Sequence, residues 1–187
     1  MSFRTKDGKR LAKTLRTRAS QPRVGERAPS DKQLRQYLKS AGNAADHSGL
    51  RPWRMITLRG DERNRLGAAM SEAHGDRHPS TKPLRAPLLI AVVGSYRADK
   101  FSKVPQWEQL AVAVEVAHGL QLLLQAEGWG SFWRTGRIVE EPAVRAFHGL
   151  GEHEQLLGWL YVGEMTDRPK AARKRSLPDA SLTALHG

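Results

Sequence analysis

Residues 106–127 read QWEQLAVAVEVAHGLQLLLQAE, the longest helix-like apolar stretch of the chain. Only a few polar side chains interrupt it between its ends, namely Glu108, Gln109, Glu115, His118, Gln121 and Gln125. A helix that is apolar nearly all round must be buried on several sides. We therefore expect a helix that lies at the centre of the fold or against another subunit.

Shorter segments surround this helix. The run LLIAVV at 88–93 predicts a strand buried on both faces. Ser30 and Gln33 form a capping-box pattern at the start of a helix over about 31–42. The remaining expected elements are helices at about 8–17, 61–73 and 140–147, strands at 53–59 and 156–163, and loops at 18–30, 43–53, 75–87 and 128–136. Helices and strands mix without strict alternation, which predicts the α+β class.

Length and composition indicate one domain with a real core. The chain has 187 residues, 39% of them hydrophobic, and no cysteine. Disulfides, thiolate nucleophiles and Cys-ligated metal clusters are therefore excluded. We expect a single domain over 1–187 with flexible ends at about 1–7 and 174–187. The start, MSFRTKDGKRLAK, lacks the apolar run of a signal peptide, which favours a cytoplasmic protein without a membrane partner.

The excess positive charge lies at the two ends of the chain. The formal charge is +12, with +7 in residues 1–30, +5 in residues 168–175, −1 from Asp179 and +1 in residues 31–167. A phosphodiester track needs a basic stripe along one element, so this distribution argues against nucleic acid as a partner. The two ends are either solvated tails or, if they meet in space, one compact anion site.

Several common site motifs are absent. The sequence has no GxGxxG, P-loop, HExxH or GxSxG pattern. Its seven histidines are scattered, which disfavours a metal site. Without cysteine or metal, any electron transfer must be carried by an organic cofactor. The polar and aromatic loops at 43–53 and 128–136, which follow buried elements, are the best places for a ligand.

Five landmarks occur in a distinctive order. They are R-x-S (Arg18, Ser20), D-H-x-x-x-x-P-W (46–53), P-x-W-E-Q (105–109), G-x-x-W-R-T-G (130–136) and L-Y-V-G (160–163). Together, over about residues 9–170, they resemble the nitroreductase family of FMN-dependent oxidoreductases, and most of all its short-chain bacterial subgroup. The resemblance implies a mixed sheet flanked by helices and a homodimer with one FMN in each of two interface clefts.

The resemblance also implies an activity. In a ping-pong cycle NADH or NADPH reduces the flavin, which then reduces a nitroaromatic, a quinone or a similar small-molecule electron acceptor. Hydride passes between nicotinamide C4 and flavin N5, which needs stacked geometry and no catalytic side chain. Two alternatives stay open: a flavin-binding protein of this fold without reductase activity, and a basic nucleic-acid-binding module.

The resemblance assigns phosphate binding to both ends of the chain. Arg18 and Ser20 match the phosphate-binding R-x-S. Ala19 stands where many members have a second arginine, so one contact is lost or is supplied by Arg23. After the last expected strand, either Arg168 or Lys170 takes the position of a basic residue on the phosphate. A solvated tail is the other interpretation of these residues and of Arg173, Lys174 and Arg175.

Two further segments are implied to meet the flavin ring or its ribityl chain. Asn43 and His47 fall where the subgroup contacts flavin from the partner subunit, although a turn role for Asn43 and a surface role for His47 are also open. Trp133, Arg134 and Thr135 match the stretch along the isoalloxazine; the alternative is an aromatic loop that plugs the helix end. We expect core packing for Trp53, and core or interface positions for Glu115 and His118.

Overall fold

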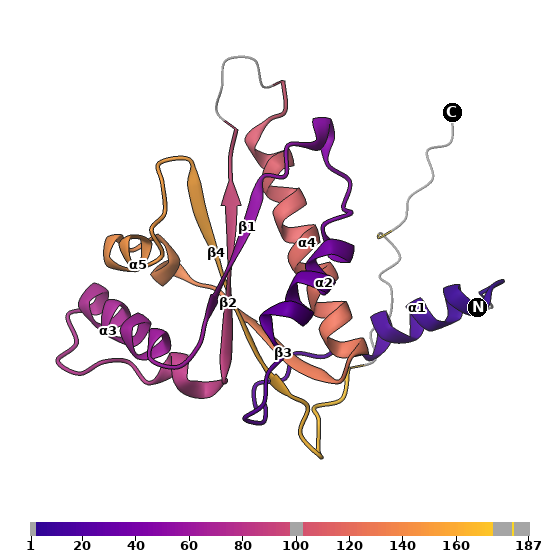
Figure 1. Cartoon of the computed structure of the whole chain (residues 1–187), viewed down its shortest axis with the longest axis horizontal. Helices are drawn as coiled ribbons and strands as arrows, with labels where there is room; N and C mark the ends of the chain where they lie inside the picture. The colour runs from indigo at the N-terminus through magenta and orange to yellow at the C-terminus, as the bar shows by residue number, and fades with distance from the viewer. Residues whose placement is uncertain (1–2, 98–102, 174–180, 182–187) are drawn as a thin grey trace.

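The computed structural model describes residues 3–97, 103–173 and 181, and within them one antiparallel sheet lies between two layers of helices (Figure 1). The α-helices are α1 (Lys6–Thr17), α2 (Asp31–Ala41), α3 (Glu62–His74), α4 (Gln106–Ala126) and α5 (Pro142–Phe147). The strands are β1 (Trp53–Leu58), β2 (Leu88–Ser95), β3 (Trp129–Arg134) and β4 (Glu154–Glu164). Short 3-10 turns are η1 (His47–Gly49), η2 (Lys82–Arg85) and η3 (Arg137–Glu140).

The expected α+β class is confirmed, but the sheet is not mixed. Its order is β1-β2-β4-β3, and each neighbouring pair within the described residues is antiparallel. β2 and β3 do run in the same direction, and the connection between them contains α4. The sheet is nevertheless antiparallel throughout because β4 inserts between β2 and β3 and runs the opposite way.

β2 is buried on both faces, as its apolar run predicts. Its odd-numbered residues from Leu89 to Val93 pack in the core formed with α3 and α5. Its even-numbered residues from Leu88 to Val92 pack in the core formed with α2 and α4. Successive strand side chains point to opposite faces, so one strand contributes to both cores. Each fully buried aliphatic side chain adds about 1.5–3 kcal/mol to the stability.

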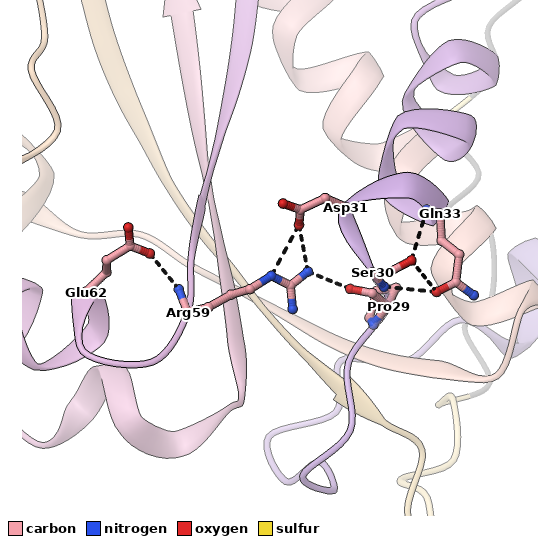
Figure 2. Close-up of polar contacts among 6 residues, drawn as sticks. All are labelled: Pro29, Ser30, Asp31, Gln33, Arg59 and Glu62. Carbon is pink, nitrogen blue, oxygen red and sulfur yellow. Dashed lines mark hydrogen bonds and ion pairs between the residues drawn. The ribbon is translucent and has the colours of Figure 1, made fainter.

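The capping box at the start of α2 is present. The Ser30 hydroxyl accepts the Gln33 N–H at 3.3 Å, and the Gln33 side chain accepts the Ser30 N–H at 2.9 Å (Figure 2). Arg59, just after β1, donates through Nη2 to Asp31 Oδ1 at 2.9 Å and to the Pro29 carbonyl at 2.6 Å. These bonds attach the first turn of α2 to the end of β1 and so hold α2 over its face of the sheet.

The segment 128–136 is not a loop for most of its length. Residues 129–134 form β3 and pair with β4 from Trp129↔Glu164 to Arg134↔Trp159. The cluster of glycines around an aromatic run led to the wrong expectation. Gly128 is the turn, with φ of +81°, whereas Gly130 lies inside the strand, where a Cβ would be only 2.9 Å from Val24 Cγ1. A glycine is needed there for close packing and not for a bend.

Elsewhere the expected boundaries are close to the observed ones. The loop 75–87 contains only the turn η2, and β4 extends the expected strand at both ends, from Glu154 to Glu164. α1 begins at Lys6, where the Thr5 hydroxyl accepts the Gly8 N–H at 3.0 Å. The prediction of flexible ends stays a prediction; residues 174–180 and 182–187 lie outside the described part of the chain.

An ion pair between β1 and the start of β4 leads to a test of acid stability. Arg54 donates to both carboxylate oxygens of Glu154, from Nε at 2.6 Å and from Nη2 at 2.8 Å. This hydrogen bonding lowers the pKa of Glu154 from its usual 4.5 to about 2. A depressed carboxyl pKa stabilises the fold above about pH 4.5, and that contribution is lost as the pH falls toward about 2.

We expect Glu154→Gln to lower the free energy of unfolding at pH 7 by about 1–2 kcal/mol, once partial exposure of Arg54 is allowed for. The difference between variant and wild type should shrink steadily between pH 4.5 and 2 in urea titrations. The matched control is Glu164→Gln, because its partner Arg27 is 79% exposed and the pair should add less. A wild-type–variant difference that stays constant down to pH 2 would contradict the assignment.

Candidate functional site

Both basic ends of the chain lie on one cavity. This cavity has a volume of about 760 Å³ and is lined by Leu15 and Arg16 of α1, by Arg18, Ala19 and Ser20, and by residues 170–173. Four of the lining residues are cationic: Arg16, Arg18, Lys170 and Arg173. Of the two arrangements that the sequence leaves open, separate tails or one compact anion site, the geometry matches the second.

Hydrogen bonds from the body of the fold position Arg18, Ala19 and Ser20. The Arg18 N–H ends α1 by donating to the Thr14 carbonyl at 3.0 Å. The Ala19 N–H donates to Gln125 Oε1, in the last turn of α4, at 3.3 Å. The next backbone N–H, that of Gln21, donates to the Ser131 carbonyl of β3 at 2.8 Å. The segment is therefore held between the end of α4 and the outer edge of the sheet.

Lys170, and not Arg168, lies on the cavity of Arg18. Arg168 lines a neighbouring cavity of about 530 Å³ together with Arg23 and Asp167. Arg23 thus lines this neighbouring cavity and not the cavity of Arg18. Lys170 lines both cavities. The additional cations on the Arg18 cavity are Arg16, two residues earlier on α1, and Arg173.

Trp133, Arg134 and Thr135 lie at the end of β3, on a second cavity of about 480 Å³. The Arg134 guanidinium lies 4.7 Å from the ring centre of Phe132 and 5.3 Å from that of Tyr161. The Trp133 indole faces the other side of the sheet and donates to the Leu157 carbonyl at 3.1 Å. Opposite faces are expected for adjacent strand residues. The loop 75–87 also lines this cavity, through Asp76, Ser80 and Lys82.

Close contact between β3 and β4 depends on one glycine. Gly158 has φ of +113°, and a Cβ there would lie 2.2 Å from the Arg134 carbonyl oxygen. The β2–β4 register shifts at this point, so Leu157 is the extra residue of a bulge. Because Leu157 is bulged out of the β2–β4 pairing, its carbonyl can accept the Trp133 indole N–H. Trp133 is therefore held in one orientation.

A neutral histidine supports the inner wall of the second cavity. Trp159, which lines the cavity, donates its indole N–H to His148 Nε2 at 3.0 Å. His148 Nδ1 lies 2.8 Å from the Val144 carbonyl and must donate to it, because Nε2 is an acceptor. Burial lowers the pKa of His148. Burial likewise raises the pKa of the Tyr161 hydroxyl, which lines the same cavity.

The outer edge of β3 offers backbone groups near Thr135. The Ser131 carbonyl points outward to Gln21, so the alternation of a strand also points the N–H and C=O of Trp133 outward. From Ser131 to its end at Arg134 the strand advances about 10 Å. A ligand that has its anionic end at Ser20 can therefore run along this edge and reach the second cavity.

Within one chain, His47 lies far from the first cavity. His47 Nδ1 is 3.3 Å from Glu108 Oε1, in the first turn of α4, whereas Ala19 is bonded to Gln125 in the last turn. Seventeen residues of helix separate the two contacts by roughly 25 Å. The Asn43 N–H donates to the Ser40 carbonyl at 3.2 Å, which is a turn role. A single chain does not bring all the predicted site residues together.

One face of α4 is exposed although it is partly apolar. Trp107 is 70% exposed and Val114 is 42% exposed, and Ala111 and His118 lie on the same side at helical spacing. Neither His118 nor Glu115 is a core residue, because both are exposed in the single chain. The core interpretation of these two residues was wrong; an interface position stays a prediction. On α1, Leu11 and Leu15 are also exposed.

Two residues of this site have no recognisable sequence signal. Gln21 and Gln125 hold the segments that line the first cavity, and both act on backbone groups more than 100 residues away. Only long-range proximity reveals such a role. Trp53, expected in the core, is partly buried and packs against Gly42.

The described residues contain no group of three or more His, Asp or Glu side chains placed to hold a metal ion. None of the helices in the described ranges has the length and apolarity needed to cross a membrane.

Comparison with known proteins agrees with the fold and the order of these elements. The profile of the nitroreductase family matches residues 15–164. A protein of Escherichia coli strain K12, provisionally named NAD(P)H nitroreductase YdjA, is 34% identical over 173 residues, covering 88% of this chain and 92% of its own. A provisionally named NAD(P)H nitroreductase of Haemophilus influenzae is 30% identical over 168 residues, covering 86% and 90%.

Solved structures show the same architecture. A nitroreductase-like family protein from Bacillus cereus superposes with a TM-score of 0.81 at 22% identity, with all of both chains covered. An FMN- and NADPH-dependent nitroreductase, NfnB, from a Sphingopyxis strain gives a TM-score of 0.73 at 16% identity, covering 95% of this chain and 99% of the other. The chain belongs to the nitroreductase family, and it is therefore an enzyme of the nitroreductase type.

Proposed function

We propose that this protein is an FMN-dependent NAD(P)H oxidoreductase that acts on nitroaromatic, quinone or similar acceptors and works as a homodimer. The observation that carries the proposal is the cavity at which Arg18, Ser20 and Lys170 meet, because a phosphate dianion needs such a set of donors. The names of its relatives, which include NAD(P)H nitroreductases and an FMN-dependent structure, support the cofactor and the co-substrate.

The chain's own groups suit the separate parts of FMN. The cationic cavity would hold the phosphate, with Arg18 and Lys170 as charged donors and Ser20 as a hydroxyl donor. The outer edge of β3 would follow the ribityl chain toward Trp133 and Thr135. Arg134 beside the second cavity would stabilise negative charge on the pyrimidine end of the ring. FMN, when bound, supplies the hydride chemistry, accepting from NADH or NADPH and reducing the acceptor.

A dimer supplies the part of the site that one chain lacks. His47 lies near the start of α4, and the cationic cavity lies near its end. Asn43 precedes His47 by four residues on the same connecting segment. If the exposed faces of α4 from two chains pack antiparallel, the start of one helix comes next to the end of the other. Each site would then combine the cationic cavity of one chain with Asn43 and His47 of the second. The exposed Trp107 and Val114 are the apolar groups that such packing would cover.

The expected result of the direct test is a yellow protein that bleaches. Purified protein, or protein to which FMN has been added, should show the flavin absorption band in the blue region of the visible spectrum. Under anaerobic conditions, NADH or NADPH should bleach it, and a nitroaromatic or quinone should restore the colour. Protein that stays colourless with added FMN would contradict flavin binding. Bound flavin that neither nucleotide reduces would favour a flavin-binding protein without reductase activity.

A further inference from the structure

Gln21 is a buried amide between the two cationic cavities. It is only 5% exposed, and every polar group of its side chain has a partner. Its Oε1 accepts the Lys170 N–H at 2.8 Å, and its Nε2 donates to the Lys170 carbonyl at 2.8 Å. Nε2 also lies 3.3 Å from the Ala19 carbonyl. The side chain therefore pairs with Lys170 as the peptide group of a neighbouring strand would.

These two bonds are the attachment of the C-terminal segment. From Thr166 to Arg173, the described structure contains no hydrogen bonds other than those between Gln21 and Lys170. The nearest preceding bond is from the Met165 N–H to the Gly128 carbonyl at 3.2 Å. Lys170 and Arg173 contribute two of the four cations on the Arg18 cavity. The position of those two cations thus depends on one side chain.

Gln21 itself is fixed to the sheet. Its backbone N–H donates to the Ser131 carbonyl at 2.8 Å, and its side chain packs where Gly130 has no Cβ, since such an atom would be 3.2 Å from Gln21 Cβ. A rigid strand edge therefore sets the position of the amide. An amide can both accept the Lys170 N–H and donate to the Lys170 carbonyl, whereas a carboxylate lacks the donor.

We propose that Gln21 is a positioning residue that completes the phosphate site by holding residues 170–173 beside Arg18 and Ser20. The inference deepens the proposed function and rests on it, because the ligand is taken to be the phosphate of FMN. Gln21 does not line the Arg18 cavity and need not touch the flavin. Its effect should therefore appear only with ligands that carry the phosphate.

The test compares FMN with riboflavin, which has the same ring and ribityl chain but no phosphate. We expect Gln21→Met, which keeps the volume and removes both polar groups, to weaken FMN binding at least tenfold and to leave riboflavin binding within about twofold. Gln21→Glu keeps the acceptor but turns a buried carboxylate oxygen toward the Lys170 and Ala19 carbonyls, so it should weaken FMN binding at least as much. The matched control is Gln155→Met, which removes a side-chain bond to the Tyr96 hydroxyl on another part of the sheet. It should preserve the FMN-to-riboflavin ratio.

A second measurement needs no flavin. Trypsin should cleave the Lys170–Ala171 bond of flavin-free Gln21→Met at least tenfold faster than that of the wild type, as followed by mass spectrometry. A wild-type cleavage rate together with an unchanged FMN-to-riboflavin ratio would overturn the inference, as would an equal loss of both flavins. If the wild type binds neither flavin, the proposed function fails, and the cleavage rates alone then decide whether Gln21 holds the segment. Should Gln21→Met not fold, Gln21→Glu gives the same two readouts.

Discussion

Val114→Glu is expected to produce a monomer that no longer retains FMN. Val114 lies on the exposed face of α4 between Ala111 and His118, the face that the proposed dimer buries. A carboxylate buried without a partner costs about 3–5 kcal/mol, and a twofold interface contains the substitution twice. The dissociation constant of the dimer should therefore rise by more than about 100-fold. FMN should be lost with the dimer, because in the proposed dimer Asn43 and His47 reach the site from the second chain.

Analytical ultracentrifugation with absorbance detection at the flavin band measures both effects at once. The matched control is Leu84→Glu, because Leu84 is 42% exposed, as Val114 is, but lies on η2 away from α1 and α4. The control should remain dimeric and yellow. A dimeric Val114→Glu variant would place the interface elsewhere. A monomeric variant that keeps its flavin would show that the second chain contributes nothing to binding.

Arg18→Ala is expected to weaken FMN binding by roughly one to two decades. A hydrogen bond to a charged group is worth about 1.5–3 kcal/mol, and the Arg18 cavity keeps three other cations, so the loss is large but incomplete. Fluorescence titration with FMN and with riboflavin separates the phosphate contribution from the rest. Riboflavin affinity should hardly change, because the ring and the edge of β3 are untouched.

The control for Arg18 is Arg23→Ala, which removes the same charge from the neighbouring cavity. It should leave FMN affinity within about twofold. If Arg23→Ala weakens binding as strongly as Arg18→Ala, the phosphate lies in the neighbouring cavity, and Arg23 supplies the contact that Ala19 lacks. If Arg18→Ala alone has no effect, Arg18 is not part of the site.

Residue pattern alone was enough to predict the elements that pack in ordinary ways. The apolar run at 88–93 and the helix at 106–127 are where they were expected, since burial on both faces leaves a clear mark on composition. The capping box at Ser30 was readable because both of its partners lie within three residues. Local signals of this kind need no knowledge of distant contacts.

The segment 128–136 shows where pattern was insufficient. Glycines beside tryptophans look like a loop, but Gly130 lies inside β3 and allows Val24 and Gln21 to approach the strand. Likewise, α4 is apolar enough to suggest a central helix, yet one side of it is open to solvent in the single chain. Whether a glycine makes a turn or admits a neighbour depends on what packs against it, which composition does not record.

For this protein, the order of its landmarks and the charge at its two ends were sufficient to indicate the family, the α+β class and a phosphate ligand, because these depend on residue types and on local spacing. Only the folded chain decided that Lys170 rather than Arg168 lies on the cavity of Arg18, that Arg134 and Trp133 face opposite sides of the sheet, and that His47 is a helix length away from the cavity of Arg18. Those facts follow from strand pairing and from the bonds of a buried amide to backbone 149 residues away, and such long-range contacts exist only once the chain has packed.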